Sequence, residues 1–156
     1  MPYWRLYYHF VWATKNRLPL ITSDAEEVLF GYLIGKAHDM KSVVHAVGGI
    51  EDHMHLVVSV PPSITLSDFA GRLKGSSSHR MNEILDDAFA WQGGYGVVSF
   101  SERELRWVVE YANGQKQHHA EQTAVEKLEE ITVDGDGPAP TVVWTLKGSP
   151  GAEPPG

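Results

Sequence analysis

The order in which strand-like and helix-like segments follow one another is the feature that most limits the folds open to this chain. Residues 4–13 alternate between two faces, one of which carries Trp4, Leu6, Tyr8, Phe10 and Trp12. A period of two with many aromatic side chains indicates a β-strand. Strand and helix periodicities, with capping and turn residues, predict a helix near residues 22–37, strands at 42–50 and 53–60, a helix at 65–85 and a Gly-rich strand at 91–100.

This β-α-β-β-α-β order predicts an α+β fold of the ferredoxin-like (RRM-like) kind, in which an antiparallel sheet carries two helices on one face. An additional C-terminal helix should begin after Ser101, because Ser101 and Glu104 form a Ser-x-x-Glu capping box. The predicted apolar stripe of the first helix is Val28, Leu29, Tyr32, Leu33 and Ala37. The other face of the sheet is then available for a site or a partner.

Composition narrows the class of protein. The chain has 156 residues, no cysteine and a net charge of −7, which excludes a cysteine nucleophile and argues against binding nucleic acid through bulk charge. No apolar run approaches the ~18 residues of a membrane span, so we expect a cytoplasmic protein with no membrane partner. Residues 135–156 are rich in Gly and Pro. We therefore expect one domain over residues 1–130 and a flexible, acidic Gly/Pro-rich tail over residues 131–156.

The tripeptide His53-Met54-His55 is the first candidate functional motif. On a strand, residues two apart point the same way, with Cα atoms about 6.6 Å apart at ~3.3 Å per residue. Two imidazoles at that spacing can converge on one ion, whereas Met54 faces the core. A His-x-His pair also arises by chance in a chain with eight histidines. Two histidines are too few to close a metal site, so a third ligand is needed.

The predicted last helix offers further polar groups. On a helical period, one stripe carries Trp107, Tyr111, Gln115 and His118. A tyrosine hydroxyl can act as a covalent nucleophile, and an amide oxygen suits a hard divalent cation. The simpler interpretation is that Tyr111 is a packing residue and Gln115 a solvated amide. The turn-like pair Asn113-Gly114 also raises the alternative that the helix stops there, which would take Gln115 off the face of Tyr111.

Three segments in combination resemble the IS200/IS605-like transposases, the single-tyrosine (Y1) members of the HUH endonucleases. They are residues 52–58 (DHMHLVV), 91–97 (WQGGYGV) and 111–119 (YANGQKQHH). The opening stretch at residues 12–19 (WATKNRLP) is also similar to the start of the family. The resemblance covers roughly residues 4–120, and the joint pattern is more specific than any one motif.

This resemblance implies a set of roles. His53 and His55 would be two metal ligands and Gln115 the third, holding Mg²⁺ or Mn²⁺, and Tyr111 would be the catalytic nucleophile. It would attack a phosphate of single-stranded DNA, forming a 5′-phosphotyrosine link and releasing a 3′-hydroxyl. The family acts as a homodimer, in which the tyrosine helix of one subunit completes the histidine pair of the other. Its DNA carries a hairpin beside the cleavage site, so we expect a transposase that cleaves and rejoins strands at element ends.

Basic side chains are the candidates for DNA contacts. They are Lys15, Arg17, Arg72, Lys74 and Arg80, which could neutralise phosphates or could simply form solvated surface. Two other functions stay open: a catalytically silent or domesticated protein that binds hairpin DNA on the same fold, and an unrelated two-histidine hydrolase for a small phosphoester. Covalent joining of Tyr111 to DNA would distinguish the transposase from both of these alternatives.

Overall fold

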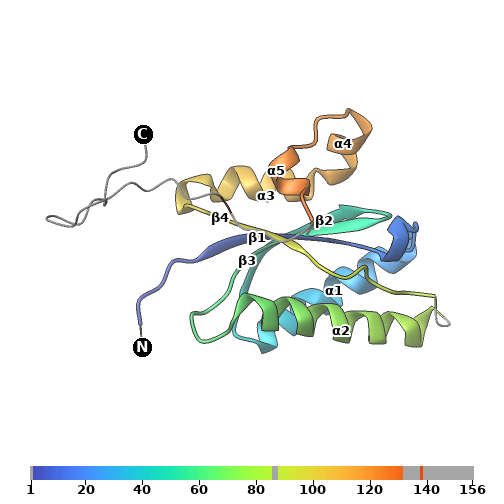
Figure 1. The fold of residues 1–156 in the computed structure, drawn as a ribbon, viewed down its shortest axis with the longest axis horizontal. Helices are drawn as coiled ribbons and strands as arrows, with labels where there is room; N and C mark the ends of the chain where they lie inside the picture. Colours follow the sequence, from blue (N-terminus) through green and yellow to red (C-terminus); the bar gives the residue numbers. More distant parts are fainter. Residues whose placement is uncertain (1, 86–87, 132–137, 139–156) are drawn as a thin grey trace, which may run out of the picture.

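A four-stranded antiparallel sheet separates two layers of helices (Figure 1). The computed structural model describes residues 2–85, 88–131 and 138. The strands are β1 (Tyr7–Ala13), β2 (Val43–Ile50), β3 (His53–Ser59) and β4 (Gly96–Phe100), in the spatial order β2-β3-β1-β4. The helices are α1 (Ser23–Asp39), α2 (Leu66–Ile84), α3 (Leu105–Asn113), α4 (Gln115–Ala120) and α5 (Glu126–Glu129). The ferredoxin-like α+β arrangement predicted from the sequence is confirmed.

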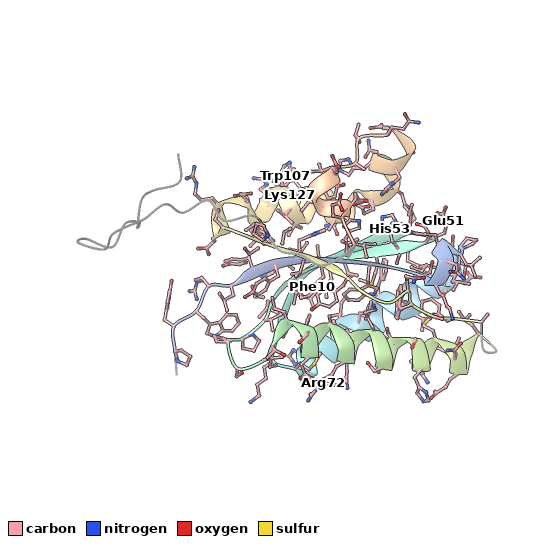
Figure 2. The ribbon with its side chains drawn as sticks, in the orientation of Figure 1. Phe10, Glu51, His53, Arg72, Trp107 and Lys127 are labelled. Carbon is pink, nitrogen blue, oxygen red and sulfur yellow. The ribbon has the colours of Figure 1, made fainter. Side chains whose placement is uncertain are left out.

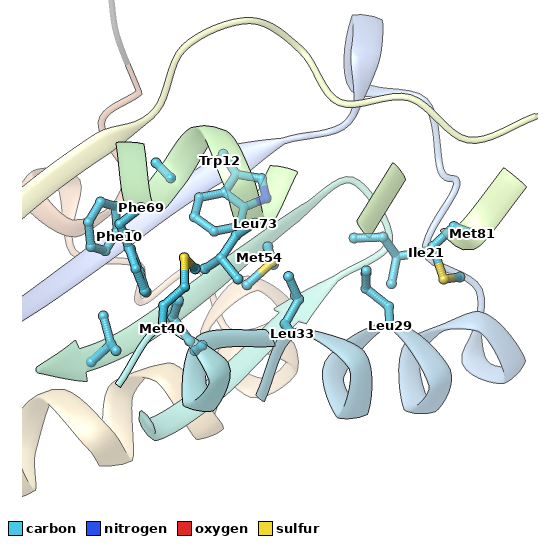
Figure 3. Close-up of a cluster of buried hydrophobic side chains, with 14 of the residues drawn as sticks. Phe10, Trp12, Ile21, Leu29, Leu33, Met40, Met54, Phe69, Leu73 and Met81 are labelled. Carbon is cyan, nitrogen blue, oxygen red and sulfur yellow. The ribbon is translucent and has the colours of Figure 1, made fainter. Parts of the chain in front are cut away.

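Helices α1 and α2 cover one face of the sheet and build the main hydrophobic core with it (Figure 3). The even-numbered residues of β1 and β3 point into this core, because successive strand residues face opposite sides. They include Phe10, Trp12, Met54 and Leu56, which pack in one cluster with Leu29 and Leu33 of α1 and Phe69 and Leu73 of α2. The odd-numbered residues of the same strands, including both histidines of the motif, are thereby directed to the other face.

Helix α3 packs on that other face, against β2 and β3 (Figure 1). Ala46 and Val57 of the sheet form a second, smaller cluster with Val108 and Ala112 of α3. The helix approaches the sheet most closely at Gly48, where an added Cβ would overlap the carbonyl oxygen of Ala112. Since β3 is covered on both faces, all seven of its residues are buried. This packing sets the height of α3 above the histidine pair.

Several local expectations are corrected by the structure. The first strand begins at Tyr7 rather than Trp4. The fourth begins at Gly96 rather than Trp91, because Trp91 forms only an isolated bridge with Thr14 and Gly94, with φ 89°, interrupts the extended backbone. The Trp91 indole N–H donates to Ser77 Oγ on α2 at 2.9 Å.

The predicted capping box is also wrong. The Ser101 hydroxyl meets the carboxylate of Glu104 at 3.5 Å instead of a backbone amide, and a 3-10 turn, Glu102–Glu104, precedes α3. In α1, Leu29, Leu33 and Ala37 of the predicted stripe are buried, but Val28 is exposed.

No helix within residues 2–85 and 88–131 combines the length and apolar character needed to cross a membrane. The predicted tail at residues 131–156 lies outside the described residues, apart from Ile131 and Pro138.

Candidate functional site

His53 lies on β3, on the face of the sheet that carries α3, α4 and α5 (Figure 2), and His55 follows two positions later on the same face. Their exposed fractions are 3% and 0%, and their ring centroids are 5.1 Å apart. The predicted convergence of the two rings is therefore present, and Met54 between them points into the main core. Two imidazoles buried on one face need polar partners, because an unpaired buried polar group is costly.

The first partner is His9, on the neighbouring strand β1. His9 Nε2 lies 2.7 Å from His55 Nδ1, and both rings are buried. The register pairs Val57 of β3 with His9, so His55 lies on the diagonal, within reach of a long side chain. Burial, together with the nearby His55, lowers the pKa of His9 to about 3, so this ring is neutral at ordinary pH.

The second partner is Glu129 on α5, whose carboxylate lies among three imidazoles. Its Oε1 is 3.2 Å from His53 Nε2 and 2.7 Å from His119 Nε2, and its Oε2 is 2.8 Å from His55 Nε2. Although burial raises the pKa of Glu129, the hydrogen bond with His53 and the close imidazole of His55 outweigh burial and hold that pKa well below its usual range. The carboxylate is therefore ionised. The four ligand-type atoms of this cluster lie within 4.8 Å of one another.

His53 is held from its other side by Asp52. Asp52 Oδ1 accepts a hydrogen bond from His53 Nδ1 at 2.7 Å, and Arg17 Nη1 lies 3.7 Å from the same carboxylate oxygen. Burial lowers the pKa of His53, but the hydrogen bonds to Glu129 and Asp52 outweigh it and raise the pKa above its ordinary value. For His55, burial prevails and lowers the pKa. The two motif histidines thus have different electrostatic environments.

Tyr111 reaches the same cluster from α3. Its hydroxyl donates to Glu129 Oε2 at 3.3 Å and accepts from the backbone N–H of Val125 at 2.7 Å. Its ring lies edge-on to that of His55, with centroids 5.9 Å apart. Burial is the main cause that raises the pKa of the phenol. One carboxylate oxygen therefore contacts both the phenol and His55, within a single chain.

Gln115 lies beside Tyr111 even though the helix is interrupted. Helix α3 ends at Asn113 and α4 begins at Gln115, which is the interruption that the Asn113-Gly114 pair suggested. Gly114, with φ −95° and ψ 19°, departs from helical values, but its N–H still donates to the Glu110 carbonyl oxygen and its own carbonyl oxygen accepts from the His118 N–H, so the two helices follow one another without an intervening loop. The alternative in which Gln115 leaves the face of Tyr111 is wrong: its amide N–H donates to the carbonyl oxygen of Tyr111 at 3.3 Å.

The side-chain oxygen of Gln115 points toward the histidine cluster. Gln115 Oε1 lies 3.0 Å from His119 Nε2, and the residue is 1% exposed. The same His119 nitrogen contacts Glu129 Oε1. His118, also on the predicted stripe, stacks on the ring of Tyr111 with centroids 4.6 Å apart. The site thus combines imidazole, carboxylate, amide and phenol groups that are buried or partly buried.

Comparison with known proteins identifies the family. The family model described as "Transposase IS200 like" matches residues 2–115, which is more than half of the chain. The chain belongs to the IS200-like transposase family. The ISDra2 transposase TnpA of Deinococcus radiodurans is 28% identical over 127 residues, which cover 72% of this chain and 85% of that protein. The IS200 transposase of Salmonella typhimurium is 31% identical over 85 residues, 54% of this chain and 55% of its own.

Solved structures agree with this assignment. A protein described as a transposase from Deinococcus radiodurans R1 superposes with a TM-score of 0.61 at 25% identity, over 71% of this chain and 92% of that chain. A REP-associated tyrosine transposase bound to a REP hairpin superposes with a TM-score of 0.55 over 72% of this chain and 70% of its own. At 18% identity, the second likeness shows the shared fold.

The five basic residues predicted to contact DNA lie in two places on this transposase. Lys15 and Arg17 are in the 3-10 turn Lys15–Arg17 next to the site, where Arg17 Nη1 is 3.4 Å from His53 Nδ1. The other three, Arg72, Lys74 and Arg80, are on α2, in the opposite helical layer, where Figure 2 labels Arg72.

The three on α2 already have partners within the chain. Arg72 pairs with Asp68 and Arg80 with Glu83 on the helix surface. Lys74 Nζ donates to the carbonyl oxygens of Gln92 and Gly94 at 2.8 and 2.7 Å. Burial lowers the pKa of Lys74.

Three residues outside the predicted set, His9, His119 and Glu129, also lie in the site of this transposase. His9 is on the polar side of the first alternating strand, and period two already places it on the face opposite the core. His119 comes directly after the predicted stripe. Only knowledge of the break at Gly114 would have shown that His119, next to His118, also faces the site. Glu129 is one acid in an acidic segment, and nothing in its spacing from the His pair signals a contact.

Proposed function

We propose that this transposase cleaves and rejoins single-stranded DNA at the ends of a mobile element through a 5′-phosphotyrosine intermediate at Tyr111. The observation that carries the proposal is the meeting of the Tyr111 hydroxyl with the cluster around His53 and His55 through Glu129 Oε2. A buried packing tyrosine would not need to bring its hydroxyl to a set of ion-binding groups. The family membership of the chain supports the same reaction class.

The reaction is a displacement at phosphorus. The Tyr111 oxygen would attack the phosphate, the bond from phosphorus to the 3′ oxygen would break, and a 3′-hydroxyl would leave. The phenol must lose its proton in this step, and its pKa is raised by burial. The acceptor in contact with it is Glu129 Oε2, to which the hydroxyl already donates, and passing that proton on to the departing 3′ oxygen would balance the step. The reverse attack by a 3′-hydroxyl on the phosphotyrosine would rejoin the strand, since the covalent link conserves the phosphodiester energy.

The residues present fit a divalent cation, which we propose to be Mg²⁺ or Mn²⁺. His55 Nε2 is fully buried and has no hydrogen bond of proper geometry among the described residues, as expected for a nitrogen that is a ligand. His53, His55 and Gln115 would hold the ion, since Gln115 Oε1 points toward the cluster. A bound ion would polarise the phosphate and offset the charge that develops on it.

Hairpin recognition is proposed by analogy with the REP-associated relative, whose structure contains a REP hairpin. Arg17 and Lys15 are next to His53 and would hold the phosphates of the single strand near Tyr111. Arg72, Lys74 and Arg80 on α2 stay candidates for contacts farther along the DNA. Because the chain carries a net charge of −7, its DNA affinity should depend on these few bases and fall steeply with salt.

A covalent trapping experiment tests the reaction. A labelled single-stranded DNA from the ends of the element, with its hairpin, is incubated with the protein and Mn²⁺ and then run on a denaturing gel. Wild type should form a protein–DNA adduct, and Tyr111→Phe should bind the DNA but form none. Tight hairpin binding without any adduct in wild type would instead establish the catalytically silent DNA-binding function.

We also propose a homodimer, following the family resemblance. Within one chain Tyr111 lies beside its own His55, so assembly within each subunit is the alternative to the exchange of tyrosine helices that the resemblance implies. Mixing Tyr111→Phe with His55→Ala protein decides between the two assemblies. Adduct formation only in the mixture would show that subunits complete each other's sites, and its absence in a verified mixed dimer would show that each chain completes its own.

A further inference from the structure

The Glu129 carboxylate has no role among the three proposed ligands, yet it lies at the centre of the cluster. Its side chain is 18% exposed. Its Oε1 contacts His53 Nε2 and His119 Nε2, and its Oε2 contacts His55 Nε2 and the Tyr111 hydroxyl. It reaches this place from α5, which lies beyond the residues 2–115 that match the family model.

The contact between Glu129 and His55 is close without being a hydrogen bond. The two atoms are 2.8 Å apart, but His55 Nε2 lacks a partner of hydrogen-bonding geometry among the described residues. Two ligands at right angles, each about 2.1 Å from a cation, lie about 3 Å apart. Close pairs that are poorly aligned for hydrogen bonding are therefore what adjacent ligands of one ion produce.

Charge favours a carboxylate at this position as well. Two neutral imidazoles and one amide bring no negative charge to a divalent cation, and hard cations such as Mg²⁺ and Mn²⁺ prefer anionic oxygen. His119 Nε2 contacts the oxygen of Glu129 at 2.7 Å and that of Gln115 at 3.0 Å. An imidazole N–H placed between two oxygens holds both in position, as outer-sphere partners do in metal sites.

The segment that carries Glu129 is fixed on two sides. Leu128 is buried, at 2% exposed, and the Val125 N–H donates to the Tyr111 hydroxyl. Gly96 of β4 passes so close to the carbonyl oxygen of Glu130 that a Cβ there would overlap it. The carboxylate is thus held over the histidines by packing as well as by its own polar contacts.

From these contacts we propose that Glu129 is a direct ligand of the divalent cation, an anionic fourth ligand supplied by α5. The inference rests on the proposed function, which places an ion at His53 and His55. In the DNA-free protein this ligand neutralises part of the charge of the ion. It also connects the ion to the nucleophile, because the same Oε2 that lies beside His55 Nε2 accepts from the Tyr111 hydroxyl.

Calorimetric titration of the full-length, DNA-free chain with MnCl₂ tests the ligand role without using activity. Glu129→Gln keeps the shape but removes the charge, and should weaken Mn²⁺ binding at least about tenfold, because loss of even an outer-sphere partner costs 10–100-fold. Glu130→Gln is the matched control, since Glu130 is exposed on the next position, and should bind as wild type does. Melting temperatures of all variants establish that they are folded.

A second variant separates ligation from general negative charge. Glu129→Asp keeps the charge but shortens the side chain by one methylene. If Glu129 is a ligand, this variant should lose most of the Mn²⁺ affinity that Glu129→Gln loses. If Glu129 is only a nearby charge, Mn²⁺ affinity should stay close to that of wild type. Unchanged or tighter Mn²⁺ binding by Glu129→Gln would overturn the inference while leaving the proposed function intact. Failure of wild type to bind Mn²⁺ any better than His55→Ala would overturn both.

Discussion

His9 Nε2 and His55 Nδ1 are 2.7 Å apart, and this contact decides which nitrogen of His55 carries a proton. One of the two rings must donate to the other. If His55 Nε2 is to bind a cation through its lone pair, its proton must be on Nδ1, and His9 Nε2 must then accept. His9 can accept because burial keeps it neutral, with a pKa of about 3.

Replacing His9 should therefore weaken metal binding although His9 is not one of the proposed ligands. His9→Leu leaves His55 Nδ1 without a partner, and we expect Mn²⁺ affinity to fall about 10–100-fold and stability to fall by about 1–3 kcal/mol. Titration calorimetry and urea unfolding measure the two effects. His45→Leu is the control, because His45 on β2 contacts Ser59 Oγ instead. Equal Mn²⁺ affinity in the two variants would show that His9 does not position His55.

The close approach of α3 to the sheet should make Gly48 intolerant of any side chain. In Gly48→Ala the new methyl group would overlap the carbonyl oxygen of Ala112, so the helix carrying Tyr111 must shift. We expect a loss of about 1–3 kcal/mol in unfolding free energy, as in overpacked cores, together with reduced DNA adduct formation. Gly35→Ala on α1 has open space around it and should stabilise the protein by roughly 0.5–1 kcal/mol. Similar effects of both substitutions on stability would contradict the close contact.

Lys74 should act as a structural residue of the loop before β4. Lys74→Met removes two hydrogen bonds from a charged group to backbone carbonyls, so we expect a loss of about 1–3 kcal/mol. Arg72→Met, whose exposed ion pair with Asp68 is worth at most about 1 kcal/mol, should change stability little. Urea unfolding compares them. A Lys74→Met protein with unchanged stability and weaker, less salt-dependent DNA binding would instead make Lys74 a phosphate contact.

Arg17 should contribute more to DNA binding than Arg80. Arg17 is half exposed beside Asp52 and His53, whereas Arg80 is on α2 in the other layer. Arg17→Gln should lower the affinity for single-stranded hairpin DNA and reduce the slope of log K against log salt by about 1. Fluorescence anisotropy at several salt concentrations measures both quantities. An equal or larger effect of Arg80→Gln would place the DNA across α2.

The arrangement of the histidine pair follows directly from local sequence. Period two on a strand places His53 and His55 on one face and Met54 on the other, whatever the rest of the chain does. The order of strands and helices likewise follows from local patterns, and it leads to the ferredoxin-like sheet because few topologies are compatible with it. The joint spacing of the histidines, Tyr111 and Gln115 can likewise be read from the sequence alone. The family resemblance that rests on this spacing is confirmed.

Only tertiary packing decided which side chains of different helices and strands contact one another. Whether Gln115 stays beside Tyr111 depended on the dihedral angles of Gly114, which residue type alone leaves open. The contacts of Glu129 with His53 and His55 join a four-residue helix to a strand more than seventy positions earlier. No periodic signal encodes such a contact, because periodicity reports which way a side chain faces and not which distant element packs over it.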